Sequence, residues 1–170
     1  MKTILFLLFI VSGISVFAVK PQPTDKKATK ETVKLYQNLL ELKKKKLMFG
    51  HQDALAYGHG WVYEEGRSDV KDVCGDYPAV YGWELGHLEL GDAYSLDSVH
   101  FDKIQNWIVE VYERGGLNTI SWHLRNPFTG GSSWDTSSKK VVSSILPGGE
   151  KHELFLQYLD YLAEFLKGCK

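Results

Sequence analysis

Polar and aromatic side chains follow three short apolar segments of this sequence, at the point where each segment ends. The segments are residues 47–52, 79–84 and 117–123. The side chains at their ends are His51, Gln52, Trp83, Glu84, Trp122 and His123. An indole ring packs well against the apolar C–H face of a sugar ring, and the polar groups can bond to the sugar hydroxyls. These residue types therefore indicate a glycan-binding site, to which Asn126 and Trp134 of the following loop would also contribute.

A metal site is the alternative use for the histidines. His51, His87 and His123 could be joined by Asp53 or Glu89, because histidine nitrogens and carboxylate oxygens are both zinc ligands. The sequence contains no HxH, HxxH or HExxH pattern, and an isolated histidine at a strand end is usually a hydrogen-bonding group. We therefore expect no metal ion and no other cofactor.

Hydrolysis of a glycosidic bond sets a further requirement. It needs a pair of carboxyl groups, about 5–5.5 Å apart in enzymes that retain the anomeric configuration. Glu84 is the only carboxylate directly at the end of an apolar segment, whereas Glu89 and Asp92 lie further along the loop. The sequence thus offers a binding surface without a convincing catalytic pair.

The three apolar segments are expected to be strands separated by helices. Apolar spacing and capping residues predict helices over residues 29–46, 69–73, 98–114 and 151–167. The strands begin at positions 47, 79 and 117, which are 32 and 38 residues apart, and this spacing suits successive βα units. Functional residues at the C-terminal strand ends are typical of such sheets. The predicted fold class is therefore α/β, of the (β/α)8 TIM-barrel family.

The length of the chain limits how much of a barrel it contains. An eight-unit barrel takes about 250 residues, whereas this chain has 170. The chain accounts for a leader helix and the first three βα units, with a fourth strand due just after its last residue. We therefore expect a truncated gene product or a fragment. The alternative is a complete small α/β domain, which would leave two open sheet edges.

The first residues have the pattern of a secretory signal peptide. A basic start at Lys2 is followed by an apolar run over residues 4–17 and by a small-residue cleavage pattern that ends at Ala18. The expected organisation is a signal peptide at 1–18, a polar lead-in at 19–28 and a partial barrel domain at 29–170. An uncleaved anchor is the alternative, although the run is short for a bilayer span. The predicted location is secreted or periplasmic, with no membrane contact after cleavage.

The overall charge favours neither nucleic acid nor an anionic membrane as a partner. The formal net charge is −1, so there is no broad basic surface. The only basic run, residues 43–46, closes a predicted helix and is interpreted as its solvated end. Cys74 and Cys169 are too few for a disulfide framework, and whether they pair is left open.

Three patches of the sequence resemble glycoside hydrolase family 26. They are residues 48–52, residues 78–87, and residues 120–123 with Asn126 and Pro127. The resemblance implies a monomeric (β/α)8 barrel enzyme that cleaves β-mannan with retention, as an endo-β-1,4-mannanase. It places an acid/base glutamate at the end of strand four and a nucleophile at the end of strand seven, both beyond residue 170. By the same resemblance, His123 would contact the glycan near the cleavage point, with Trp122 supporting it.

Three hypotheses about activity remain open at this point. The first is a secreted hydrolase of which this chain forms a part. The second is a non-catalytic glycan-binding product of a truncated gene, in which the aromatic rim holds a glycan without cleaving it. The third is a metal-dependent deacetylase or hydrolase, which would contain stoichiometric metal when purified.

The N-terminal pattern generates a prediction about export. We expect cleavage after Ala18, because the small residues at 16 and 18 suit a signal peptidase. N-terminal sequencing of the exported protein should therefore begin at Val19. Exported protein that still begins at Met1 would contradict the assignment.

Overall fold

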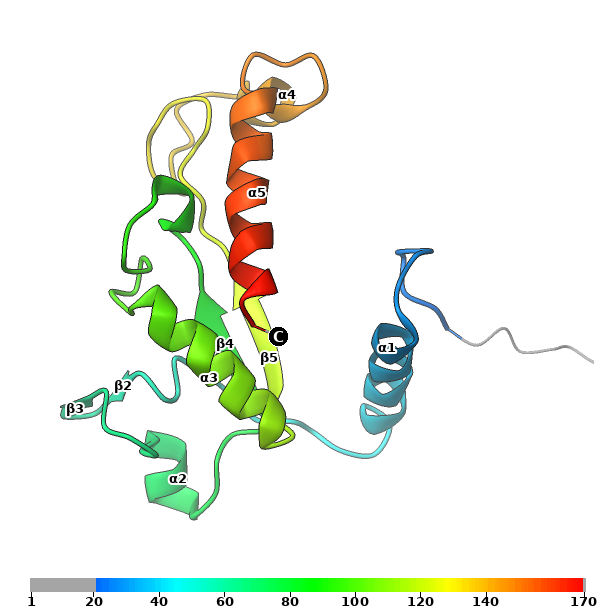
Figure 1. The fold of residues 1–170 in the computed structure, drawn as a ribbon, viewed down its shortest axis with the longest axis vertical. Coiled ribbons are helices and arrows are strands. Elements are labelled where there is room, and N and C mark those ends of the chain that lie inside the picture. The colour runs from blue at the N-terminus through cyan, green and yellow to red at the C-terminus, as the bar shows by residue number, and fades with distance from the viewer. Residues whose placement is uncertain (1–20, 170) are drawn as a thin grey trace, which may run out of the picture. The chain divides into compact units, whose positions relative to one another are not determined.

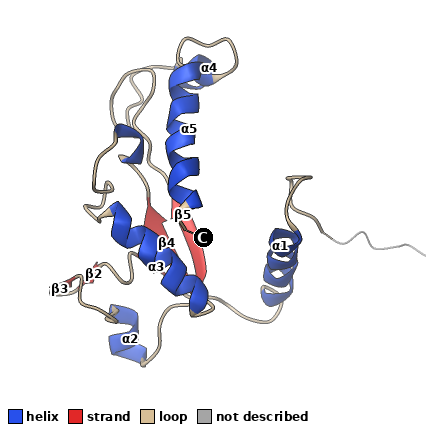
Figure 2. Ribbon diagram, viewed as in Figure 1, coloured by secondary structure: helices blue, strands red, loops and turns tan. Residues whose placement is uncertain are grey.

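The computed structural model describes residues 21–169, and its helices and strands are shown in Figure 1 and, coloured by type, in Figure 2. The expected signal peptide, residues 1–18, lies outside the described residues. The chain forms two compact units, Met1–Leu47 and Met48–Lys170. In the described part of the chain, no helix is both long and apolar enough to cross a membrane.

The first unit contains one helix, α1 (Lys30–Leu42). The hydroxyl of Thr29 caps it by accepting a hydrogen bond from the backbone N–H of Thr32 at 3.2 Å, which satisfies one of the free donors of the first turn. The helix was expected to continue to Lys46, but it ends at Leu42. The amides of Lys44 and Lys45 bond three residues back, the tighter pattern that is common where a helix ends.

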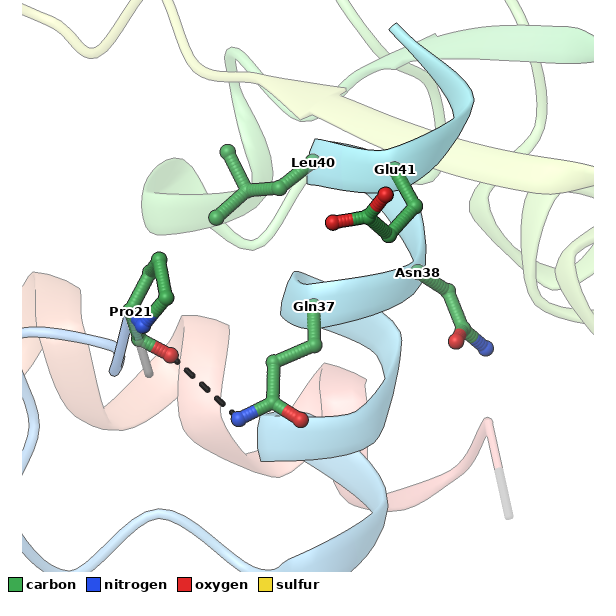
Figure 3. A pocket seen from close by; sticks show the side chains of 5 residues that line it. All are labelled: Pro21, Gln37, Asn38, Leu40 and Glu41. Atoms are coloured by element: carbon green, nitrogen blue, oxygen red, sulfur yellow. Dashed lines mark hydrogen bonds between the residues drawn. The ribbon is translucent and has the colours of Figure 1, made fainter. Parts of the chain in front are cut away.

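A pocket on the first unit is shown in Figure 3. Its lining residues are Pro21, Gln37, Asn38, Leu40 and Glu41. The side-chain amide of Gln37 donates to the carbonyl of Pro21 at 3.3 Å. The pocket contains neither an aromatic ring nor a histidine, so it lacks the residue types that indicated a glycan site.

The second unit is built on a three-stranded parallel sheet with the strand order β1–β4–β5. The strands are β1 (Gly50–Gln52), β4 (Val80–Glu84) and β5 (Leu117–Ser121). Gly50 lies opposite Val80, and Val80 lies opposite Leu117. The predicted strands and their parallel order are confirmed. The first strand is shorter than expected, because residues 47–49 precede its first paired residue.

Helices follow the strands as the βα pattern requires. They are α2 (Asp69–Cys74), α3 (Phe101–Glu113), α4 (Val141–Ile145) and α5 (His152–Lys167). Helix α3 ends where Gly115 adopts a φ of 82° and Gly116 donates to the carbonyl of Val111 at 2.9 Å. Only glycine takes that backbone conformation without steric cost, so the predicted glycine stop is confirmed.

The segments predicted as loops contain short regular elements. The first loop holds a hairpin of β2 (Tyr57–Gly58) and β3 (Trp61–Val62), and the second holds a 3-10 helix at Leu88–Leu90. The five-residue helix α4 lies within the third loop. Elements this short are fixed by tertiary contacts rather than by periodicity, which explains why the sequence pattern missed them.

The core lies between the sheet and α3, which crosses β4 and β5 in Figure 1. Ile104 of α3 and Tyr81 of β4 are fully buried. The Trp83 ring stacks on Tyr81 at a centroid distance of 6.2 Å and on Trp107 of α3 at 5.9 Å. The side chains of Cys74 and Cys169 are both free thiols in this structure.

The packing of α3 generates a prediction about stability. Ile104→Ala removes a side chain with no exposed surface, so we expect it to lower the free energy of unfolding by about 2–5 kcal/mol. Glu113→Ala, at an exposed position of the same helix, should change it by less than about 0.5 kcal/mol. Denaturant unfolding followed by tryptophan fluorescence measures both. Equal losses in the two variants would show that α3 does not pack as described.

Candidate functional site

Neighbouring residues at the end of each strand lie on opposite faces of the sheet. Successive side chains of a strand alternate between faces, and residues in register share a face. Glu84 lies opposite Ser121, whereas its neighbour Trp83 lies opposite Ile120. The face that carries Gln52, Glu84 and His123 is therefore open to the strand ends. The other face, covered by helices, carries His51, Trp83 and Trp122.

Trp83 belongs to the helix-covered face and is part of the core. Its side chain has no exposed surface, and its indole N–H donates to the side-chain oxygen of Asn118 at 2.8 Å. A ring enclosed in this way has no face to offer a sugar. The structure thus favours the alternative interpretation of Trp83 as a core aromatic over the expected binding role.

Trp122 is half-buried and links the end of β5 to its surroundings. Its ring stacks on Phe155 of α5 at a centroid distance of 6.4 Å. Its indole N–H donates at 3.0 Å to Glu89, a buried carboxylate that also accepts the backbone N–H of Arg125 at 2.6 Å. These contacts fix the chain on both sides of His123, which is the kind of supporting arrangement that the prediction for Trp122 requires.

His51 and Gln52 separate at the end of β1. His51 faces α2, where it lines an apolar pocket with Phe49 and Val70. Its Nδ1 atom is buried and has no hydrogen-bond partner. Gln52 is exposed, and its carboxamide lies over Gly82, so closely that a Cβ atom at this position would clash with it. Only Gln52 of the two can therefore reach a ligand bound over the open face.

A buried carboxylate, that of Glu84, joins β4 to the residues after β5. Only 2% of the Glu84 side chain is exposed. Its Oε1 atom accepts the backbone N–H groups of Gly86 at 2.7 Å and His123 at 2.8 Å. Its Oε2 atom accepts the Ser121 hydroxyl at 2.5 Å and lies 2.8 Å from Nδ1 of His123. Both carboxylate oxygens are thus already occupied within the protein.

These contacts determine the protonation of Glu84. Burial alone would raise its pKa, because it disfavours the charged form. The hydrogen bonds from His123, Ser121 and Gly86 act in the opposite direction, and the net effect is a pKa below the usual range. Glu84 is therefore an ionised carboxylate at neutral pH.

The rings of His123 and Trp134 form an exposed stacked pair. Their centroids are 5.0 Å apart with planes inclined by 13°. The side chain of His123 is 47% exposed and that of Trp134 63% exposed. Beside them is a crevice of about 30 Å³ lined by His87, Leu96, His123, Arg125, Ser132, Ser133 and Trp134. This pair is an aromatic and hydrogen-bonding surface at a strand end, as the sequence predicted for a glycan site.

Asn126 is buried and organises the loop that carries Trp134. Its side-chain oxygen accepts the backbone N–H groups of Phe128 at 3.0 Å and Thr129 at 3.2 Å, and its amide donates to the carbonyl of Asp135 at 3.1 Å. With its polar atoms engaged in this way, Asn126 shapes the loop rather than pointing toward a ligand.

The structure therefore brings together only some of the residues predicted for the site. Glu84, His123 and Trp134 form one connected group, and Gln52 lies on the same open face. Ser121, which the sequence analysis did not single out, belongs to this group because it lies two residues before His123, in register with Glu84. Within residues 21–169, no three histidine, cysteine, aspartate or glutamate side chains are arranged to hold a metal ion.

Asp53 is a second buried carboxyl group near the strand ends. It follows β1 with a φ of 49° and no exposed surface. Its Oδ2 atom accepts the Tyr57 hydroxyl at 3.3 Å, whereas Oδ1 has no partner. Burial, together with the nearby Asp97 carboxylate, raises the pKa of Asp53 to about 7. Asp53 and Glu84 thus differ sharply, because only Glu84 has enough donors to offset its burial.

Comparison with known proteins identifies relatives over nearly all of the described chain. Residues 24–170 match the model of glycosyl hydrolase family 26. A mannan endo-1,4-beta-mannosidase of Bifidobacterium adolescentis is 34% identical over 152 residues, which cover 86% of this chain and 15% of that protein. One from Bacillus subtilis is 27% identical over 148 residues, which cover 86% of this chain and 40% of that protein.

Solved structures give the same result. A GH26 beta-mannanase from Bacteroides ovatus superposes with a TM-score of 0.80 at 49% identity, over 84% of this chain and 42% of that one. An endo-beta-1,4-mannanase from Cellulomonas fimi superposes with a TM-score of 0.70 at 35% identity, over 84% of this chain and 33% of that one. The chain thus spans less than half the length of each of these relatives, and its sheet matches part of their catalytic barrel.

The unusual environment of Asp53 generates a prediction about pH. The unfolded chain loses the Asp53 proton near pH 4, whereas the folded protein keeps it until about pH 7. The free energy of unfolding should therefore fall as pH rises through this window. Asp53→Asn abolishes the titration, and asparagine tolerates the positive φ.

We expect Asp53→Asn to exceed the parent protein in free energy of unfolding by up to about 4 kcal/mol at pH 8, with the difference vanishing by pH 4. Denaturant unfolding at a series of pH values measures this. Asp160→Asn, at an exposed position of α5, is the matched control and should follow the parent throughout. Parallel curves for Asp53→Asn and the parent would refute the assignment.

Proposed function

Because the chain belongs to glycosyl hydrolase family 26, we propose that the intact barrel protein carrying it is a secreted endo-β-1,4-mannanase that acts as a monomer. The relatives that are named for mannan hydrolysis support this substrate class. The pattern of residues 1–18 supports export, to the periplasm or the exterior. Since the chain spans 42% of the Bacteroides ovatus mannanase chain, the proposal concerns the whole barrel.

The proposed chemistry is retaining hydrolysis by two glutamates. The family resemblance assigns them to strands four and seven, and the parallel strands of the described residues, β1, β4 and β5, take the places of strands one to three. Glu84 is not suited to either catalytic role, because its carboxylate is buried and both of its oxygens are occupied. We propose that this part of the barrel binds the glycan and that the other strands supply the catalytic pair.

The observation that carries the proposal is the exposed stacked pair of His123 and Trp134. Among the described residues, Nε2 of His123 has no hydrogen-bond partner, whereas Nδ1 is held by Glu84 at 2.8 Å. A sugar hydroxyl can therefore bond to Nε2 while a pyranose face packs on Trp134, which is 63% exposed. Gln52, on the same face, is a further candidate contact.

Substitution of His123 tests this arrangement. We expect His123→Ala in the intact protein to lower kcat/KM on β-mannan by about 10- to 1000-fold, because a hydrogen bond that strengthens in the transition state is lost. His59→Ala, at an exposed position of the first loop, should leave kcat/KM within about threefold of the parent. Thermal melts recorded beside the kinetics identify any variant that loses activity through unfolding.

Two outcomes would contradict the proposal. Full activity in a folded His123→Ala protein would show that the glycan does not bind at the end of β5. Mannan binding by the intact parent without hydrolysis would instead support the non-catalytic glycan-binding alternative.

A further inference from the structure

The Glu84 carboxylate contacts both the main chain and the ring of the same residue, His123. Oε1 accepts the His123 backbone N–H, and Oε2 lies 2.8 Å from its Nδ1. The opposite face of the imidazole is limited by Trp134, whose ring is nearly parallel to it at 5.0 Å. The histidine is thus held by its backbone, its ring edge and its ring face, which leaves little freedom to rotate.

The chemistry of these contacts selects one tautomer of the neutral ring. An ionised carboxylate can only accept hydrogen bonds, so the Nδ1 atom beside Oε2 must carry the proton. Nε2 then has a free lone pair and accepts a hydrogen bond rather than donating one. The partner that fits this atom is a hydroxyl group that donates.

We propose that Glu84 is a positioning residue that fixes the Nδ1-protonated tautomer of His123, so that Nε2 accepts a hydrogen bond from a sugar hydroxyl of the bound glycan. This assignment rests on the proposed function for its ligand, but the tautomer itself is a property of the protein. Glu84 acts through His123 and does not itself contact the glycan, which agrees with its 2% exposure.

A glutamine at position 84 would reverse the tautomer without a change of shape. Oε1 receives two backbone N–H groups, from Gly86 and His123, so an amide NH2 placed there would face two donors. The amide oxygen must therefore take the Oε1 position and the NH2 group the Oε2 position. That NH2 donates to Nδ1 and moves the ring proton to Nε2.

The rest of the network can adapt to the glutamine. The Ser121 hydroxyl lies within 3.3 Å of the Trp83 carbonyl, so it can donate there and accept from the new amide. Every polar group in the network would then keep a partner, and Glu84→Gln should fold. Ser121→Ala is the matched control, because it removes a hydrogen bond to the same oxygen and leaves the carboxylate facing Nδ1.

The first measurement is the tautomer of His123 in the intact protein, from two-bond ¹H–¹⁵N spectra at pH 8 with the resonance assigned by its loss in His123→Gln. We expect Nδ1–H in the parent and in Ser121→Ala, and Nε2–H in Glu84→Gln. Nε2–H in the parent would overturn the proposal. Because this reading needs no substrate, it decides the tautomer whether or not the protein hydrolyses mannan.

The second measurement is kcat/KM on β-mannan for the same variants, with thermal melts. Glu84→Gln should lose about 10- to 1000-fold, since Nε2 would then present a donor to a donating hydroxyl. Ser121→Ala should stay within about threefold of the parent. A reversed tautomer with unchanged kcat/KM would overturn the positioning role, as would equal losses in both variants. A parent that does not cleave mannan would overturn the proposed function, and the spectra would then decide the tautomer alone.

Discussion

The arrangement of the strand ends depends on a single buried carboxylate, that of Glu84. Two parallel strands are held along their length by the backbone ladder, but the residues that follow them have no such constraint. Glu84 supplies it by accepting hydrogen bonds from Gly86 on its own strand's side and from Ser121 and His123 across the sheet. Leaving a buried acceptor of this kind unpaired would be costly, so the four contacts form together and fix where the loop after β5 begins.

The elements of the fold could largely be predicted from the sequence, but the faces of the site could not. Apolar segments and glycine stops located β1, β4, β5 and α3, because these signals depend only on the local sequence. The grouping of Trp83 with Glu84 was different. The two residues are adjacent in the chain, yet the period of two places one ring in the core and one carboxylate over the open face. That difference could have been anticipated from strand alternation, since Trp83 and Glu84 are one residue apart.

Other features depend on contacts that no sequence period encodes. The 3-10 turn at Leu88–Leu90 and the helix α4 are too short to show periodicity, and each is placed by packing against α5. The different protonation of Asp53 and Glu84 follows from the donors around them. Asp53 has the Tyr57 hydroxyl alone, whereas Glu84 has backbone and side-chain donors on both oxygens. Counting carboxylates at strand ends therefore could not tell which of them would be charged.

The same distinction bears on how a carboxylate at a strand end should be interpreted in a hydrolase barrel. A general acid needs a raised pKa and access to the leaving group, whereas Glu84 has a lowered pKa and almost no exposed surface. Its hydrogen bonds favour a permanently charged acceptor, which is the property required to orient a neighbouring imidazole rather than to transfer a proton. In this protein the chemistry thus divides between two shells, with the charge inside the sheet and the groups that can meet a glycan, His123 and Trp134, outside it.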